Sequence, residues 1–515
     1  MANQQKPKTS KQQPGPHSVA PSRRLPLPVF HPDFMAEAHT AAANQALHDA
    51  LDNSVTKKDA GRKQTLADLP DADGLRQWAG EIKRHTLEHL DYYLERLEQN
   101  VIRHGGKVHF ALDNAQANAL VVDIARRSGA KLIVKSKSMV SEEMELNQAL
   151  IEAQLDVLET DLGEFILQVD HDHPTHLVMP VIHKRAAEIG QLFARYFQTA
   201  YTDQPQALAE LARVYLRRRF DEADLGVSGV NFAVAETGSI VICTNEGNGR
   251  MCTTRPRVHV AIMGMEKVIP ALEDLPVFLK LLARSATGQA LTQYTSIITG
   301  PRRPTEADGP REFHLIIMDN GRSRILAGEY RDTLRCIRCG ACLNACPVYR
   351  KVGGRSYGSV YPGPIGALLV PLFNGLEAHA HLPEASSLCG ACLEACPVQI
   401  DIPRMLIHLR QDLVRKGIGP PAARIIFGFW ARALRHGWSY RLGQVLQRRI
   451  LRLLAGRDGW VRNLPGAVRG WTQIRDFPAP PPKSFRRLYR EYRRGGPRPS
   501  TERKPHLPSR SPDIK

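Results

Sequence analysis

The chain has 515 residues, of which 43% are hydrophobic, 70 are Lys or Arg and 52 are Asp or Glu. This length allows two to four domains with a sizeable core, and the composition is ordinary for a globular protein. No run of about 18 apolar residues suggests a membrane span, and residues 1–29 lack the apolar region of a secretory signal. We therefore expect a cytoplasmic protein.

The net charge of +18 is concentrated towards the end of the chain. Residues 419–515 hold 22 Lys and Arg against five Asp and Glu, so the remainder is almost neutral. A basic segment of this kind predicts an acidic partner. The candidates are another protein, an anionic membrane surface and nucleic acid.

The first hundred residues predict an arm and two helical stretches. Residues 1–29 are polar and rich in Pro, Lys, Gln and Ser, which is typical of a disordered arm. Helices are expected over about 33–60 and 72–101. The second carries an apolar stripe at helical spacing, which we interpret as core rather than as a binding groove. Its members are Trp78, Ile82, His85, Leu87, Leu90, Tyr93, Leu94 and Leu97.

From residue 105 short apolar runs alternate with helical patterns, which indicates a parallel sheet covered by helices. The expected strands are 107–112, 131–135, 155–159 and 175–181, and the expected helices are 114–128, 142–154 and 184–200. After residue 225 strands are expected at 230–236, 239–244, 259–263, 295–299 and 313–318, with a hairpin turn at Thr237-Gly238. A helix over 266–286 would be interrupted by Pro270 and Pro276.

Beyond a cysteine-rich region, which spans about 330–405, a helix is expected over 403–416. Residues 420–455 form a basic amphipathic helical pattern. Residues 476–515 are rich in Pro and Arg and are predicted to be mostly unstructured.

Seven of the nine cysteines lie between residues 336 and 396. The first group is Cys336, Cys339, Cys342 and Cys346, followed by Pro347, which is the C-x2-C-x2-C-x3-C-P spacing of bacterial ferredoxins. Two-residue gaps let a short loop wrap three thiolates around one iron–sulfur cube, and a glycine at 340 lets the backbone approach the inorganic sulfurs. In two-cluster ferredoxins the fourth cysteine serves the other cluster.

The second group, Cys389, Cys392 and Cys396, repeats the end of the first. The pattern Cys-Gly-Ala-Cys-Leu-x-Ala-Cys-Pro-Val occurs at both 339–348 and 389–398. If each run gives its last cysteine to the cluster of the other run, two ligand sets are expected. Cluster 1 takes Cys336, Cys339, Cys342 and Cys396, and cluster 2 takes Cys346, Cys389 and Cys392.

The second group departs from the ferredoxin pattern at its first position, where Ser386 replaces a cysteine. Cluster 2 therefore has three visible thiolate ligands. A [4Fe–4S] cluster with one non-cysteine or open iron position and a [3Fe–4S] cluster both remain compatible with the residues. Ser386, Ser387 or an external ligand could fill the gap.

Zinc is the alternative metal, but it prefers cysteine pairs separated by long loops in closed sets of four, which these runs do not form. Cys243 and Cys252 lie outside the cluster region in an apolar setting and are interpreted as buried structural thiols. Lys135, Lys137, Glu142 and Glu143 could line a cleft at a strand end, although a solvated helix start is the simpler interpretation.

With both Cys-Pro motifs placed, the chain resembles the lactate utilization protein B family over roughly residues 60–480. The segments that carry the resemblance, besides the cysteine runs, are Val134–Met139, Glu159–Glu164, Gly229–Phe232, Glu236–Ile240, Thr244–Gly249 and Tyr361–Gly366. The resemblance implies a Rossmann-like α/β domain of the LUD type and a small α-helical dicluster 4Fe–4S module of ferredoxin type. It also implies that three cysteines on the second cluster are the family's own pattern.

Composition, charge and periodicity, together with this resemblance, give the expected division of the chain. It is a disordered arm (1–29), a helical segment (30–104), the LUD-type α/β domain (105–325), the dicluster module (326–418) and a basic helical and Pro/Arg-rich tail (419–515).

The resemblance further implies a role as the iron–sulfur electron-transfer subunit of a complex that oxidises L-lactate to pyruvate and allows growth on lactate. Its complex partners would be lactate utilization proteins A and C, and the electron acceptor is unknown. The chain would be an electron-transfer component rather than a complete enzyme alone. Two rivals are an α/β domain that itself oxidises a hydroxy acid, and clusters that are structural or sensory.

The basic tail then has two main interpretations, a docking surface for the partner subunits or acceptor, and peripheral contact with the inner face of the membrane. No nucleic-acid module is recognisable, so we expect no nucleic acid as a partner.

Overall fold

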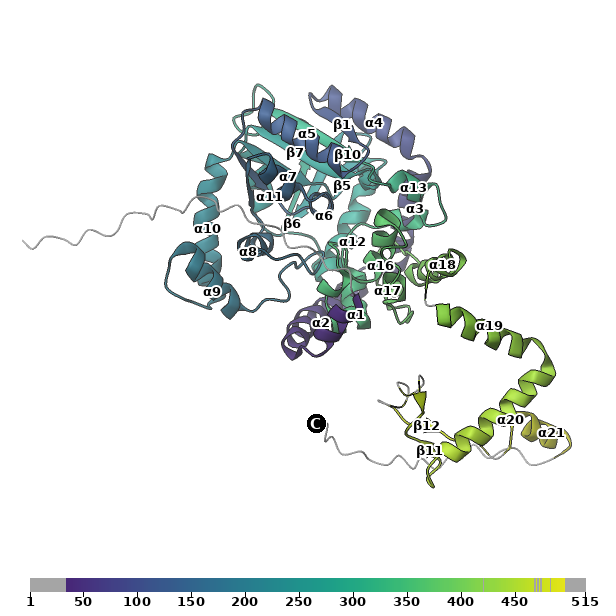
Figure 1. Ribbon diagram of the computed structural model, residues 1–515. Helices are drawn as coiled ribbons and strands as arrows, with labels where there is room; N and C mark the ends of the chain where they lie inside the picture. Colours follow the sequence, from purple (N-terminus) through teal and green to yellow (C-terminus); the bar gives the residue numbers. More distant parts are fainter. Residues whose placement is uncertain are drawn as a thin grey trace, which may run out of the picture. The chain divides into compact units, whose positions relative to one another are not determined.

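A computed structural model gives the structure of the chain (Figure 1). It describes residues 34–495 except 420, 467, 468, 470, 471, 473, 474 and 482, so the arm predicted over residues 1–29 lies outside it. The described chain forms two compact units, which divide after Ile418.

The first unit is built on a six-stranded sheet of order β1-β10-β7-β4-β2-β3, in which every neighbouring pair is parallel. The strands are β1 (Lys107–Ala111), β2 (Leu132–Lys135), β3 (Asp156–Glu159), β4 (Leu225–Gly229), β7 (Val258–Gly264) and β10 (Glu312–Met318). Every residue of β7 is buried, as expected for a central parallel strand covered on both faces. The predicted parallel sheet is confirmed; β4 was not foreseen.

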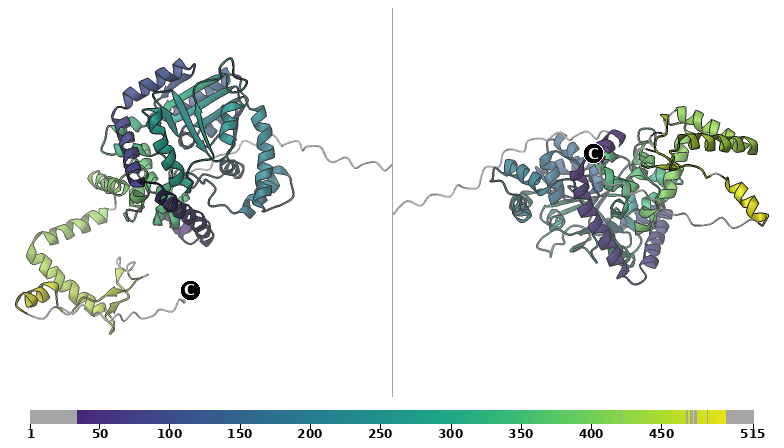
Figure 2. Two further views of the ribbon diagram at one scale, coloured as in Figure 1. Left: turned by 180° about the vertical axis from the view of Figure 1, so that it is seen from behind. Right: turned by 90° about the horizontal axis from the view of Figure 1, so that it is seen from below.

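The two faces of the sheet pack against different layers (Figures 1 and 2). Val260 and Ile262 of β7 belong to a core that includes α5 (Asn114–Arg127), α6 (Met139–Glu143) and α7 (Leu146–Glu152). Ala261 and Met263, which alternate with them, belong to a core on the other face that includes α4 (Leu90–Arg103) and a second, smaller sheet. This alternation is the two-residue period of a strand.

The smaller sheet has the order β8-β5-β6-β9 and sits beside the cysteine module. Its strands are β5 (Phe232–Val234), β6 (Ser239–Thr244), β8 (Val268–Ile269) and β9 (Tyr294–Ile298). The β5–β6 hairpin is confirmed at Gly238, whose φ of 68° is in the left-handed region. A Cβ at Gly238 would lie 2.6 Å from the backbone of Asn100, so glycine is required there on two grounds.

Helices surround these sheets. At the start of the described chain lie α1 (Phe34–Ala42), α2 (Gln45–Ala67), α3 (Ala72–Glu88) and α4 (Leu90–Arg103). Around the sheets lie α8 (Leu162–Asp170), α9 (Ala186–Phe197), α10 (Pro205–Glu222), α11 (Asn248–Thr254), α12 (Leu275–Thr287) and α13 (Arg322–Leu326), with short 3-10 turns at Met265–Lys267 and Leu272–Asp274.

Three predicted elements are wrong in part. Residues 175–181 are not a strand, because the segment turns back on itself and Thr175 N–H donates to Pro180 O. The helix expected over 142–154 is two short helices separated by Glu145, whose φ is 54°. Only the second half of 266–286 is helical, and it begins at Leu275 next to Pro276, where a proline is tolerated.

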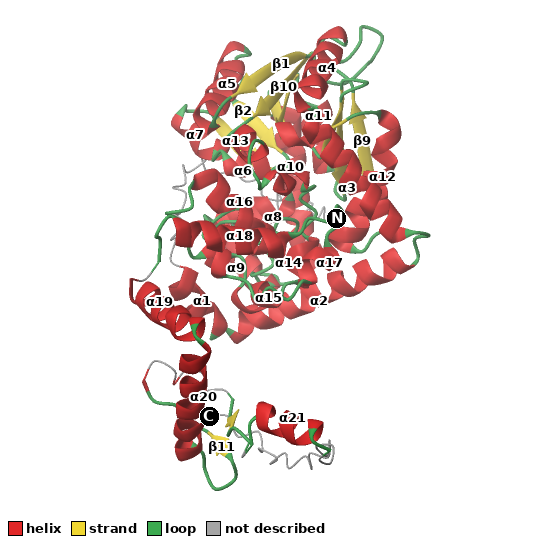
Figure 3. Ribbon diagram, turned by 90° about the vertical axis from the view of Figure 1, so that its right-hand side faces the viewer, coloured by secondary structure: helices red, strands yellow, loops and turns green. Residues whose placement is uncertain are grey.

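The cysteine module is made of short helices (Figure 3). They are η3 (Arg331–Arg335), α14 (Ala341–Ala345), α15 (Pro347–Val352), η4 (Arg355–Tyr357), α16 (Gly363–Asn374), η5 (Leu382–Glu384), α17 (Ala391–Ala395) and α18 (Ile402–Arg415). This module shares one hydrophobic core with α1, α2, α3 and α12. The predicted helix over 403–416 is confirmed.

The second unit contains α19 (Pro421–Arg435), α20 (Gly437–Leu454), β11 (Trp460–Val461), β12 (Phe477–Pro478) and α21 (Phe485–Arg493). The helical pattern over 420–455 is confirmed. The α21 helix corrects the expectation that 476–515 is mostly unstructured, for those of its residues that the structure describes. No helix among the described residues is long and apolar enough to cross a membrane.

The packing of β4 against α11 gives a first prediction. A Cβ at Gly226 would lie 1.8 Å from the backbone oxygen of Cys252, so Gly226→Ala must push the strand and helix apart. We expect a loss of about 1–3 kcal/mol of stability, as for other overpacked cores. The matched control is Gly247→Ala, where a Cβ meets no atom within 4 Å. Equal melting temperatures for the two variants would contradict this packing.

Candidate iron–sulfur centre

The two cysteine loops make the same turn. Arg338 and Leu388, which precede the second and fifth cysteines of the cluster region, have φ values of 61° and 55°. Gly340 and Gly390, two residues further on, have φ values of 76° and 86°. Two left-handed residues so close together are rare, so the sequence repeat is also a repeat of backbone conformation.

Each turn leads into a five-residue helix that ends at a cysteine. Helix α14 ends at Cys346, whose N–H donates to Leu343 O, and α17 ends at Cys396, whose N–H donates to Leu393 O. The two helices pack against each other. This contact brings the end of each cysteine run towards the other run.

Four cysteines line one apolar cavity. They are Cys336, Cys339 and Cys342 from the first run and Cys396 from the second. The remaining walls are Leu177, Ile337, Gly340, Ile365, Pro397, Val398, Ile400 and Ile402. The set that spacing predicted for cluster 1 is thus gathered around one space.

The chemistry of this donor set fits an iron–sulfur cluster. Burial raises the pKa of Cys339, Cys342 and Cys396, and neighbouring thiols raise these values further. Thiols in such a cavity ionise only beside a strong positive charge, which the iron of a cluster supplies. Backbone N–H groups are already in place for two sulfurs, at 3.4 Å from Arg338 N to Cys336 Sγ and 3.3 Å from Ile400 N to Cys396 Sγ.

The other three cysteines do not line this cavity, and two of them, Cys346 and Cys392, are buried. Burial and the nearby Cys346 raise the pKa of Cys392 to about 12, and Cys389 is among the groups that raise the pKa of Cys346. Cys346 Sγ accepts the Tyr349 N–H at 3.4 Å, while Cys389 is exposed. Cys346 therefore lies with the cysteines of the second run and not only with its own.

Ser386 occupies the place that Cys336 has in the first run. The Leu388 N–H donates to Ser386 Oγ at 3.2 Å, and the Arg338 N–H makes the equivalent contact with Cys336 Sγ. Ser386 is half-buried and Ser387 is exposed. The Ser386 hydroxyl thus accepts the same backbone hydrogen bond as the sulfur of Cys336, which is an expected cluster ligand.

A buried ion network joins the first cysteine loop to the end of the parallel sheet. Arg322 is fully buried and donates to Glu143 at 2.8 Å and to Glu266 at 2.6 Å. Glu266 also lies 3.4 Å from Arg338, within the cysteine loop, and Tyr361 donates to Glu143 at 2.6 Å. Arg322 and Arg338 hold the pKa of Glu266 at about 2 despite its burial.

Helix α3 lies directly against the second cysteine loop. Arg76 donates to the backbone oxygen of Cys396 at 3.0 Å and to that of Glu394 at 2.7 Å. A Cβ on Gly80 would lie 3.0 Å from Val398 O, so the helix backbone approaches this loop closely. Neither contact carried a signal in the sequence, because the partners are more than 300 residues apart.

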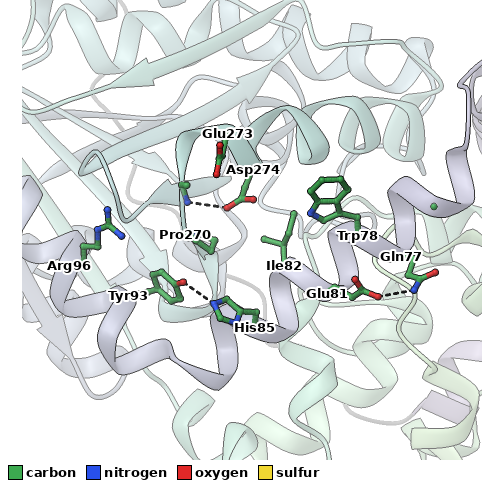
Figure 4. Close-up of a pocket in the computed structure, with 12 residues that line it drawn as sticks. Gln77, Trp78, Glu81, Ile82, His85, Tyr93, Arg96, Pro270, Glu273 and Asp274 are labelled. Carbon is green, nitrogen blue, oxygen red and sulfur yellow. Dashed lines mark hydrogen bonds between the residues drawn. The ribbon is translucent and has the colours of Figure 1, made fainter.

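A second cavity of about 660 Å³ lies along a neighbouring face of α3. Its lining includes Trp78, His85 and Tyr93, and the Tyr93 hydroxyl lies 3.0 Å from His85 Nε2 (Figure 4). Trp78 is 59% exposed. The predicted stripe is therefore core at Leu87, Leu90 and Leu97 and cavity wall at Trp78 and His85.

Lys135 and Glu143 are not at a solvated helix start, which corrects that interpretation. Lys135 is fully buried and pairs with Glu142 at 2.6 Å and with Glu159 at 2.7 Å. Lys137 pairs with Glu164 at 2.9 Å. These residues form buried or half-buried ion pairs at the ends of β2 and β3.

Cys243 and Cys252 stand apart from the cluster region. Cys252 is fully buried and lies 3.2 Å from Thr160 Oγ1, and Cys243 is half-buried. Burial raises the pKa of both thiols to about 12. Both are neutral thiols at physiological pH, although only Cys252 meets the expectation of full burial.

These features define a class: an iron–sulfur protein in which a parallel α/β domain carries a dicluster module of ferredoxin type. Three family matches cover most of the chain, the LUD domain at residues 94–318, the 4Fe–4S dicluster domain at 332–400 and the C-terminal region of lactate utilisation protein B at 414–494.

Curated relatives named lactate utilization protein B align over nearly their whole length. The Bacillus licheniformis protein is 45% identical over 88% of this chain and 95% of its own, and the Geobacillus sp. WCH70 protein is 43% identical over 90% and 98%. The chain belongs to the lactate utilization protein B family. A solved DUF162 family protein from Deinococcus radiodurans covers 44% of this chain and 98% of its own at 13% identity, with a TM-score of 0.26 that is too low to bear on the fold.

Removing Arg322, the central cation of the buried ion network, is expected to lower the free energy of unfolding strongly. Arg322→Met leaves Glu143 and Glu266 buried without their partner, and we expect a loss of about 3–5 kcal/mol of stability at neutral pH. Because Arg322 depresses the pKa of Glu266, its contribution is present above the ordinary carboxyl pKa and is lost as pH falls towards 2. The deficit of the variant should therefore shrink in acid.

The control is Lys107→Met, which removes the exposed pair with Glu312 at 2.7 Å and should cost less than about 1 kcal/mol. Unfolding followed by circular dichroism at several pH values measures both variants. A similar cost for both would mean that the buried network does not stabilise the unit.

Proposed function

We propose that this chain is the iron–sulfur electron-transfer subunit of a complex that oxidises L-lactate to pyruvate. The observation that carries the proposal is the apolar cavity lined by Cys336, Cys339, Cys342 and Cys396, in a chain of the lactate utilization protein B family. Such clusters exchange single electrons without binding or releasing the substrate. A subunit of this kind relays electrons while another subunit handles lactate.

Two ligand sets are proposed. Cluster 1, a [4Fe–4S] cluster, would be held by Cys336, Cys339, Cys342 and Cys396, which is supported by their shared cavity. Cluster 2 would be held by Cys346, Cys389 and Cys392, which is supported by the packing of α14 against α17 and by the pKa of Cys392, which burial raises and which Cys346 and Cys389 raise further. A [4Fe–4S] cluster with an open or serine-ligated iron is proposed for the second site, with [3Fe–4S] as the alternative.

The residues around the first site have separate tasks. Apolar side chains such as Leu177 and Ile365 exclude water from the cavity. Backbone N–H groups of Arg338 and Ile400 donate to the ligand sulfurs and stabilise their negative charge. The buried Arg338 guanidinium adds positive charge close by, which favours the reduced state.

We also propose that the α/β domain is of Rossmann-like type and spans 105–325, that the module spans 326–418 and is essentially helical, and that the basic tail begins at 419. The last division is supported by the compact unit that ends at Ile418. Lactate utilization proteins A and C are the proposed partners in the complex, on the strength of the family alone.

The function is tested by adding L-lactate anaerobically to this chain together with proteins A and C. Reduction should bleach the visible absorption of this chain's clusters and change their EPR signals, and it should fail when either partner is omitted. Bleaching by lactate in the isolated chain would instead assign the oxidation to its own α/β domain. No response from the full mixture would refute the proposal.

Ligand exchange between the two runs predicts long-range effects of single cysteines. Cys396→Ala should damage cluster 1, although it belongs to the second run, and Cys346→Ala should damage cluster 2. Iron content and EPR of each variant report which cluster is lost. Damage confined to the cluster of the variant's own run would show that the sets are not exchanged.

The serine position predicts which cluster is labile. Cluster 2 should lose an iron first on oxidation, because one of its positions lacks a thiolate. Ser386→Cys should protect it and lower its reduction potential, since a thiolate adds negative charge and the Leu388 N–H already faces this position. Exposed Ser387→Cys is the matched control and should not protect. Equal loss of both clusters in the unmodified protein would contradict the open position.

A further inference from the structure

Helices α19 and α20 form a long basic segment without acidic residues. Between residues 421 and 454 the chain has seven arginines and no Asp or Glu. The two helices are 15 and 18 residues long and are separated by His436 (Figure 3). A segment of this composition carries a positive potential along its whole length.

Each helix also has an apolar face. In α19, Ile425, Phe429 and Trp430 fall on one side by helical spacing. In α20, Leu442, Leu446, Ile450 and Leu453 do the same, and Trp438 lies at the edge of this face. These side chains are strongly exposed within the described structure. Phe429 is 76% exposed, Trp430 60%, Trp438 69% and Leu453 86%.

By helical spacing Arg424 and Arg435 lie on the side of α19 away from its apolar face, and Arg432 lies at the edge of that face, beside Ile425. The α20 arginines follow one edge of its apolar face; they are Arg441, Arg448, Arg449 and Arg452. This combination of an apolar face, tryptophans and flanking arginines is that of a helix lying in a membrane interface. A surface for duplex nucleic acid would need the charge but not the exposed Phe and Trp side chains.

We propose that α19 and α20 bind an anionic phospholipid surface, with their apolar faces in the boundary between headgroups and acyl chains and their arginines on the lipid phosphates. The charge identifies the occupant, because seven arginines in a segment whose sequence contains no Asp or Glu match a lipid surface of opposite sign. The inference uses residues of the second unit alone, so it stands or falls independently of the electron-transfer role.

The test is flotation of the full chain with vesicles of phosphatidylcholine, with or without about 30% phosphatidylglycerol. We expect binding to the anionic vesicles at least tenfold stronger than to the neutral ones, weakened by high salt, with a blue shift of tryptophan fluorescence. Trp430→Ser combined with Trp438→Ser, and Arg441→Gln combined with Arg448→Gln, should each lower binding at least tenfold.

Matched controls come from the first unit. Trp78→Ser removes a tryptophan that is 59% exposed, and Arg217→Gln with Arg218→Gln removes two exposed arginines of α10; none should alter vesicle binding. Equal binding to neutral and anionic vesicles, or an equal effect of control and test variants, would overturn the proposal. The proposal would also be overturned if the full chain does not bind lipid and its α19 and α20 variants instead lose binding to a partner subunit.

Discussion

Four thiols share one apolar cavity in this protein, and that arrangement is the constraint on which the rest of the first unit depends. Burial raises the pKa of Cys339, Cys342 and Cys396, so in isolation the cavity favours neutral thiols. Only a cation in their midst makes the thiolate form stable. The fold must therefore bring two distant cysteine runs to one point and keep water away from it.

The surroundings of the cavity are supplied by parts of the chain that are far apart in sequence. Gly340 lies against Val178 and His176, a segment that belongs to the α/β domain, and a Cβ there would approach Val178 to 3.3 Å. On the other side Arg76 holds the backbone of Cys396. The cysteine module is thus built into the α/β domain rather than attached to it.

The buried ion network around Arg322 also joins distant parts of the chain, here through paired charges. Arg338 lies between two ligands of the proposed first cluster, and its partner Glu266 is shared with Arg322 at the end of the parallel sheet. In a medium of low dielectric these charges interact strongly, so a change of charge at the cysteine loop is felt by the sheet end. This network provides a physical link between the two parts of the first unit.

Much of this could be predicted from local patterns, and the misses have identifiable causes. Five of the six strands of the parallel sheet could be predicted from their short apolar runs, and β4 could not. The proposed cysteine sets follow from spacing, because that spacing is characteristic of the cluster. Residues 175–181 look like a strand, but their conformation is set by contacts with the cysteine module, including Tyr349 hydroxyl to Thr175 O at 2.8 Å. Lys135 was placed in solvent because its partner Glu159 is 24 residues away.

The metal content of anaerobically prepared protein tests the central claim most directly. The account predicts a brown protein with about seven or eight irons and a similar amount of acid-labile sulfide per chain, as for one [4Fe–4S] cluster plus a [4Fe–4S] or [3Fe–4S] cluster. Stoichiometric zinc without acid-labile sulfide would contradict it.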